Sequence, residues 1–252
     1  MNTEIPENWG EDPLSEFIEG AHHNCIATFV NYKDLPVMKA LKEVDALFRC
    51  VLRIPYKPNE EILLPSFVGR SHCAYLSGIL LSTAGQVPEA YPAIRLCLEN
   101  VLYGLFIQDD PTIHEEIPER LKIWLDRGVS DEATKMCRNT FTYGRVRDHL
   151  FSRDNVLGEH AAALYQRTIT YGAHPNFYAH ATTSDLAPER GGNIQYLLPN
   201  TNACRLCIQT AVETGLCSLR IYGLILQDRF RSAGIPERIQ TIDWKNQNAE
   251  RI

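Results

Sequence analysis

Residues 66–110 of the chain are SFVGRSHCAYLSGILLSTAGQVPEAYPAIRLCLENVLYGLFIQDD. Two long apolar segments in this stretch are separated by Gly85-Gln86-Val87-Pro88. Glycine just beyond one helix and proline at the start of the next are typical of two antiparallel helices joined by a short turn. Both segments are apolar on more than one face, so other helices must cover them. The stretch therefore predicts a long αα-hairpin at the core of the fold.

Segments with apolar residues at helical spacing lie on both sides of this hairpin. Asp34 is expected to cap one of these helices, with Pro36 in its first turn, and Gly172 to end another. Pro236 is expected to lead into a polar tail. We expect an all-α, up-and-down helical bundle. The additional helical segments cover residues 13–32, 34–54, 113–127, 130–152, 156–171 and 201–232.

The segment between residues 176 and 198 departs from the helical pattern. NFYAHATT (176–183) and NIQYLL (193–198) lie on either side of Gly191-Gly192. Two such runs separated by a glycine turn favour antiparallel pairing. We expect a small β-hairpin insertion here.

The 252 residues are 44% hydrophobic and 22% charged, which is typical of a globular protein with a packed core. We expect a single helical domain over 1–252, with its core at about 66–232 and with 1–12 and 236–252 peripheral. No apolar run reaches the roughly eighteen residues of a membrane span. The acidic start MNTEIPENWGEDP lacks the basic and apolar regions of a secretory signal. We therefore expect a soluble, cytoplasmic protein without membrane contact.

The charge and the cysteines limit the classes of function. A formal net charge of -6 excludes a broadly basic surface, so any contact with RNA must be local. The eight cysteines lie mostly in apolar helical stretches and are expected to be reduced. Cys204-x-x-Cys207 allows a thiol redox function, but no βαβ setting and no second cysteine pair accompany it. We expect neither a metal nor a cofactor.

Familiar catalytic motifs do not occur in the sequence: GxGxxG, GxxxxGK[ST], HExxH and GxSxG. The second helix of the hairpin nevertheless carries polar residues on one face, since Arg95, Glu99 and Tyr103 are spaced four apart. Charges in an apolar helix are paired or functional. A structural ion pair and a functional role both remain open for Arg95 and Glu99.

A second candidate is Arg167-Thr-Ile-Thr-Tyr-Gly-Ala-His174. Cleavage of RNA without a metal needs a base, an acid and a cation beside the phosphate, and histidine and arginine can supply them. Arg153 and His160 have the same spacing, so the spacing alone does not identify a site. The simpler interpretation of His174 is a helix-capping residue.

The sequence around these residues resembles a known group of proteins. The segment GQVPEAYPAIRLCLEN (85–100), followed by a tyrosine-rich helix that ends in GAHPN (172–176), is similar to uncharacterised bacterial helical proteins of the HEPN superfamily type, some linked to abortive infection. The resemblance covers roughly residues 66–176. It implies His174 as acid and base, Arg167 as phosphate ligand, and a homodimer whose motifs face each other.

Two departures from that family's pattern weaken the implied activity. Active members usually have Asn, Asp or His after the motif arginine, where this chain has Thr168. Gly172 is also expected to interrupt the helix between the two motif residues. Both departures are typical of a member that does not cleave RNA.

Two functions are therefore expected from the sequence. One is a metal-independent endoribonuclease of stress or phage defence, with Arg95 and Glu99 as polar support. The other is a non-catalytic helical module that binds a protein or a small ligand beside residues 176–198. An open cleft that unites Arg167, His174 and the Arg95–Glu99 pair favours the first, and scattered positions favour the second. Further candidate binding residues are Tyr103, Tyr171, Asn176 and His180.

Overall fold

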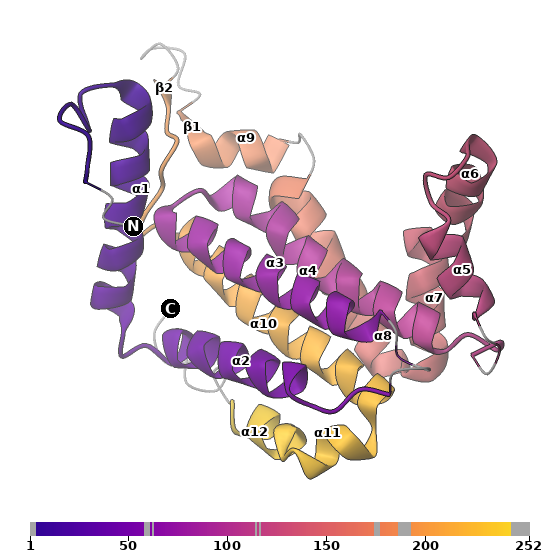
Figure 1. Cartoon of the computed structure of the whole chain (residues 1–252). Helices are drawn as coiled ribbons and strands as arrows, with labels where there is room; N and C mark the ends of the chain where they lie inside the picture. Colours follow the sequence, from indigo (N-terminus) through magenta and orange to yellow (C-terminus); the bar gives the residue numbers. More distant parts are fainter. Residues whose placement is uncertain are drawn as a thin grey trace.

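The computed structural model describes residues 4–57, 61, 63–113, 115, 117–173, 177–185 and 193–242. In these residues the chain forms an all-α bundle with one very short β-ladder (Figure 1). The elements in chain order are α1 (Pro13–Tyr32), α2 (Pro36–Leu52), α3 (Leu64–Ala84), α4 (Val87–Gln108), α5 (Glu119–Leu125), α6 (Asp131–Thr140), α7 (Tyr143–Arg153), α8 (Asn155–Thr168), the π-helical turn η1 (Ile169–Ala173), α9 (Phe177–Thr183), β1 (Ser184–Asp185), β2 (Asn193–Ile194), α10 (Asn202–Leu226), α11 (Asp228–Ser232) and α12 (Ile235–Thr241).

The predicted hairpin is formed by α3 and α4, which pack against each other. Gly85 ends α3 with a φ of 90°, and the N–H groups of Gly85 and Gln86 donate to the carbonyls of Ser82 and Leu81. This pair of hydrogen bonds is the usual way in which a glycine ends a helix. The Leu198 N–H donates to the Gly85 carbonyl at 2.8 Å, so the turn is also fixed to the segment that precedes α10.

The central helix of the bundle is α10, which contacts α2, α3, α4 and α8 (Figure 1). A helix that is buried on nearly all sides needs small or apolar residues around its whole circumference. Its polar groups bond to neighbouring helices: the Cys204 thiol donates to the Ser82 carbonyl, and the Tyr222 hydroxyl donates to Ser71 Oγ at 2.9 Å. The core is therefore assembled around a helix from the C-terminal part of the chain.

The core begins earlier in the chain than the predicted residue 66, because α2 is part of it. Met38, Val44 and Phe48 of α2 are fully buried. Pro36 occupies the first turn of α2 as predicted, but the cap position is Leu35, with no side-chain hydrogen bond. The expected cap at Asp34 was therefore wrong by one residue.

The helices α5, α6 and α7 form an arm at one side of the bundle (Figure 1). The segment predicted as one helix over 130–152 is broken at Phe141, whose buried ring contacts Tyr103 and Trp124. Thr142 then caps α7 by accepting from the Arg145 N–H. The predicted helix at 113–127 is likewise shorter, because Pro118 directly precedes α5.

The core also extends past the predicted end at residue 232. Pro236 lies in the first turn of α12 and does not lead into a polar tail. Ile235 and Ile239 are buried, and α12 packs against α10 and α11. The structure describes no residue after Ile242, so the remainder of the predicted peripheral segment lies outside it.

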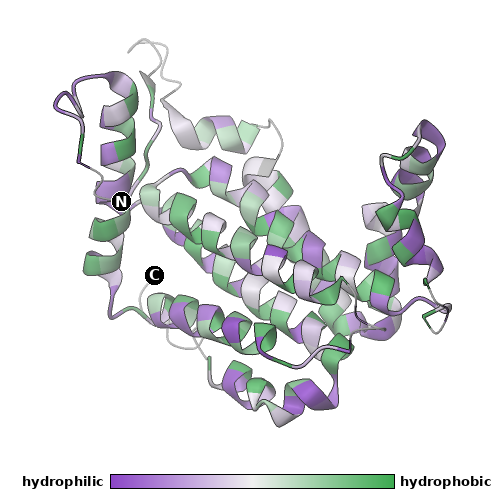
Figure 2. Ribbon diagram, viewed as in Figure 1, coloured by the Kyte–Doolittle hydropathy of each residue, from purple (hydrophilic) through white to green (hydrophobic). Residues whose placement is uncertain are grey.

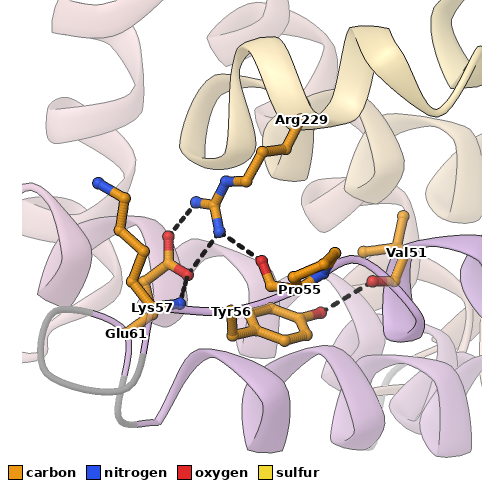
Figure 3. A network of polar contacts seen from close by, with 6 residues as sticks. All are labelled: Val51, Pro55, Tyr56, Lys57, Glu61 and Arg229. Carbon is orange, nitrogen blue, oxygen red and sulfur yellow. Dashed lines mark hydrogen bonds and ion pairs between the residues drawn. The ribbon is translucent and has the colours of Figure 1, made fainter.

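A polar network holds the segment between α2 and α3 against α11 (Figure 3). The Glu61 side chain is only 4% exposed. It accepts from both terminal nitrogens of Arg229 and from the Lys57 N–H, and Arg229 also donates to the Pro55 carbonyl at 2.7 Å. Burial raises the pKa of Glu61, but the hydrogen bonds outweigh burial, so the pKa lies below its usual value.

The segment 176–198 differs from the predicted hairpin in its first arm. Residues 177–183 form the helix α9, and only the two-residue strands β1 and β2 pair, with Ser184 opposite Ile194. Within α9 the hydroxyls of Thr182 and Thr183 donate to the carbonyls of Tyr178 and Ala179, one turn back. The predicted glycine turn at 191–192 lies outside the described residues.

None of the helices in the described ranges combines the length and the apolar character needed to cross a membrane.

Candidate functional site

Arg95, Glu99, Arg167 and Tyr171 lie in the region where α8, η1 and α10 pack against α4. His174 and Asn176 follow η1 directly and lie outside the described residues. The remaining candidates are divided between two polar groups. One group is centred on Arg167 and the other on the Arg95–Glu99 pair.

Arg167 projects from the last turn of α8 toward α10. Its Nη1 donates to Glu213 Oε2 at 2.5 Å and lies 3.5 Å from Thr210 Oγ1. The Glu213 side chain is 7% exposed and that of Arg167 is 31% exposed. A nearly buried carboxylate needs such a partner, because an unpaired buried charge is costly. The guanidinium that the ribonuclease hypothesis assigns to phosphate is therefore engaged by a carboxylate.

A row of aromatic rings begins beside this ion pair. Tyr91 of α4 is buried, and burial raises its pKa well above the usual value despite a hydrogen bond with Thr210. Its ring stacks on Tyr171 of η1 at 5.7 Å, and Tyr171 contacts Tyr178 of α9 at 5.9 Å between ring centroids. The row thus runs from the core to the exposed surface of α9.

The helix does not end at Gly172, contrary to the prediction. It continues as the π-helical turn η1 through Ala173. A Cβ atom at Gly172 would overlap the Pro88 carbonyl, so glycine is required by the close approach of η1 to α4. Single π-turns are rare and are frequent at functional sites.

The second polar group contains Arg95 and Glu99, which form the predicted ion pair. Arg95 Nε lies 3.4 Å from Glu99 Oε1, and both side chains are mostly buried. The Arg95 guanidinium also lies over the Tyr165 ring, which stacks on Tyr143 at 3.5 Å. Burial raises the pKa of Glu99 against the opposing effects of Arg95 and of a hydrogen bond from Tyr165. This group joins α4 to α7 and α8.

The two polar groups do not form one cluster. Tyr165, which contacts Arg95, and Arg167 are two residues apart on α8, and residues at that spacing point to different sides of a helix. Arg167 bonds to Glu213 of α10, whereas Arg95 contacts Glu99 and Tyr165. This placement separates the partners of Arg167 from those of the Arg95–Glu99 pair; His174, the remaining residue of the expected cleft, lies outside the described residues.

Two further candidates have other surroundings. The Tyr103 hydroxyl donates to the Phe141 carbonyl, and its ring contacts Trp124 and Phe141, so it anchors the α5–α7 arm. His180 lies exposed in the last turn of α9.

Sequence reasoning missed two features of this region. Glu213 is the single carboxylate in the 25 residues of α10. Its position in a largely uncharged stretch could have indicated a buried, paired carboxylate. Phe177 and Tyr178, at the start of α9, are 71% and 55% exposed. They fell within a segment interpreted as a strand, so their grouping on a helix was not anticipated.

The thiol interpretation loses its support in the structure. Cys204 and Cys207 are fully buried, and burial raises the pKa of Cys207 to about 12 and that of Cys204 as well. A thiol that stays protonated is a poor nucleophile. Within the described part of the chain, no three side chains of His, Cys, Asp or Glu gather as a metal site would require.

Comparison with known proteins adds no relative. No family model matches the chain, and no curated protein and no solved structure is significantly similar to it. The chain is therefore described by its fold and its contacts alone. It is an all-α bundle with a central α10, an Arg167–Glu213 ion pair and a row of aromatic rings that reaches the surface.

We expect Arg167→Ala to lower the free energy of unfolding by about 2–3 kcal/mol, because Glu213 is left nearly buried without its cation. Urea unfolding measures this loss. Adding Glu213→Gln to Arg167→Ala is expected to restore a large part of it, since the uncompensated charge is removed. Equal stability of Arg167→Ala and the parent would show that the pair is not structural.

Proposed function

We propose that this chain is a non-catalytic helical interaction module that binds a partner protein through the aromatic start of α9. The observation that carries the proposal is the exposure of Phe177 and Tyr178 on a helix that is anchored to the core. Aromatic side chains are enriched at protein interfaces and supply much of the binding energy there, and Phe177 and Tyr178 are two such side chains side by side on one helix.

The aromatic row gives α9 a fixed position. The Tyr178 ring contacts the Tyr171 ring, which stacks on the buried Tyr91. Phe177 in turn contacts the Tyr178 ring at 5.9 Å. Rings that are held before binding lose less conformational freedom when a partner covers them, which favours affinity. A partner with an apolar pocket for these two rings fits this surface.

The engagement of Arg167 is the second support for a module without catalysis. In a metal-independent ribonuclease the arginine must be available to the phosphate in the transition state. Here its Nη1 is bound to Glu213, and Thr168 beside it bonds to its own helix through the Tyr165 carbonyl. Neither residue is arranged around an incoming anion.

One observation favours the ribonuclease as a second candidate. The helix continues from Arg167 through η1, so Gly172 does not separate Arg167 from His174 as the sequence suggested. With this continuity the HEPN-like function requires His174 as acid and base, with Arg167 released from Glu213 when RNA binds.

A site-specific crosslinking experiment tests the module. A photoreactive amino acid is placed at position 177. The control carries it at position 136, because Met136 on α6 is 55% exposed, as Tyr178 is, but lies on another helix. The protein captured from position 177 is purified, and its affinity for the chain is measured. We expect Phe177→Ala and Tyr178→Ala to weaken binding about tenfold each, because truncating an interface anchor costs more than 1 kcal/mol.

The affinity of a control variant for the same captured protein is measured alongside. Met136→Ala is expected to leave the affinity unchanged. Equal affinity of the Phe177→Ala variant and the parent would refute the binding surface. Cleavage of RNA by the purified chain, abolished in His174→Ala, would establish the ribonuclease instead.

A further inference from the structure

Helix α1 lies at the edge of the molecule, with the segment that precedes it beside its N-terminal half, and no described element covers the outer side of its C-terminal half (Figure 1). Its inner side is bonded to the end of α3, since Asn24 Nδ2 donates to the Ala84 carbonyl and Thr28 Oγ1 to the Thr83 carbonyl. The C-terminal turns of α1 are nevertheless strongly hydrophobic (Figure 2). The exposed apolar residues are Leu14 at 67%, Ile18 at 43%, Ile26 at 54% and Val30 at 60%.

These four residues have a symmetric spacing. Ile18 and Ile26 are each four residues from His22, and Leu14 and Val30 are each eight residues from it. Residues four apart form a continuous ridge along a helix, and such ridges pack against each other at a crossing angle of about −50°. A ridge that is symmetric about one residue is complementary to a second copy of itself that runs in the opposite direction, as the two-fold axis of a homodimer requires.

The charges on α1 favour the same orientation. Acidic residues occur only at its N-terminal end, at Glu11, Asp12, Glu16 and Glu19, and residues 20–33 contain none. His22 and His23 lie at the centre of α1 and Lys33 at its C-terminal cap. A parallel copy would set the acidic ends against each other, whereas an antiparallel copy sets each acidic end beside a half that has no carboxylate. The helix dipoles are also opposed in the antiparallel pair.

We propose that the outer side of α1 is a self-association surface, on which α1 of a second copy of this chain packs antiparallel with its centre at His22. In this dimer Ile18 of one protomer lies near Ile26 of the other. The proposal rests on α1 alone, and neither the aromatic start of α9 nor the Arg167–His174 segment takes part in it.

The size of the surface indicates which kind of complex it can form. Residues 14–30 span about 24 Å of helix at 1.5 Å per residue. Leu80 of α3 is exposed and lies next to Cys25, where it extends the surface. A single helix pair buries less than the roughly 800 Å² per partner that stable complexes bury. A weak, transient dimer is expected for such a contact, so the concentration series should extend well above about 10 µM.

Sedimentation of the full chain over a concentration series tests the proposal. The wild-type chain is expected to be in monomer–dimer equilibrium. Ile26→Glu is expected to weaken the dimer at least tenfold, because each copy places a carboxylate against apolar residues. Asn31→Glu is the matched control, since Asn31 is also exposed but lies two and a half turns from His22, on the other side of the helix. It is expected to leave the dimer intact.

Disulfide trapping tests the orientation. In a background with Cys25, Cys50 and Cys73 replaced by serine, a mixture of Ile18→Cys and Ile26→Cys proteins is expected to crosslink, whereas Ile18→Cys alone is not. A chain that stays monomeric at concentrations well above 10 µM, or a dimer that Ile26→Glu leaves unchanged, would overturn the proposal. Crosslinking of Ile18→Cys to itself would overturn the antiparallel arrangement.

Discussion

Gly85→Ala is expected to lower the free energy of unfolding by about 3 kcal/mol or more. Gly85 has a φ of 90°, a conformation that strains any residue with a Cβ atom. A Cβ at this position would also lie 2.6 Å from the Leu198 nitrogen and 2.8 Å from the Pro199 nitrogen, both of them backbone atoms. The turn between α3 and α4 and the segment before α10 must then move apart, which breaks the hydrogen bond from Leu198 to residue 85. Urea unfolding measures the loss.

Two substitutions separate the causes of this effect. Gly69→Ala, in the interior of α3 with nothing within 4 Å of the added Cβ, is expected to stabilise the chain slightly. Gly85→Asn tolerates a positive φ better than alanine does. It is expected to be about as destabilising as Gly85→Ala, because the overlap with Leu198 remains. Full stability of Gly85→Asn would show that backbone strain alone matters.

Arg229→Ala is expected to cost about 3 kcal/mol, because it leaves the carboxylate of Glu61 buried without its cation. The loss also frees the segment before α3 from α11, since Arg229 holds Pro55 as well as Glu61. Arg231→Ala, two residues further along α11, is the control. Its ion pair with Asp228 is exposed and is expected to contribute about 0–1 kcal/mol.

The effect of Arg229→Ala depends on pH in a defined direction. The pKa of Glu61 in the folded chain lies below its ordinary value of 4.5, so the ion pair stabilises the fold fully above that pH. The stabilisation is lost as the pH falls through the lowered pKa of the folded state. Without Arg229 the pKa of Glu61 in the folded variant is higher than in the folded wild type, because burial is opposed by fewer hydrogen bonds. The difference in unfolding free energy between wild type and Arg229→Ala should therefore be largest near neutral pH and shrink as the pH falls from the pKa of the variant toward the lowered pKa of the wild type. A difference that grows on acidification would contradict this assignment.

The parts of the fold that depend on local sequence could be predicted. The α3–α4 hairpin follows from glycine and proline at adjacent helix ends, and the start of α2 at Pro36 follows from the same preference. The Arg95–Glu99 pair was predictable because its members are one helical turn apart. Each of these features needs only information from neighbouring residues.

The parts that depend on distant contacts could not be predicted. Arg167 and Glu213 are 46 residues apart, so nothing near Arg167 indicates that α10 supplies its partner. The close approach of Gly172 in η1 to Pro88 likewise involves a residue of another helix. The helical conformation of residues 177–183 likewise overrode a strand-like pattern. For Arg167 and for Gly172 the contact comes from a part of the chain that only the fold brings close.

The position of α10 has a consequence for the order in which the chain can acquire its structure. Nearly every helix of the core packs against α10, yet α10 begins only at Asn202. During synthesis the apolar sides of α2, α3, α4 and α8 therefore leave the ribosome long before the helix that joins them. Such a chain exposes its future interior for most of its translation, a state that favours aggregation and recognition by chaperones. About the last fifth of the sequence thus completes the core whose other helices are made earlier.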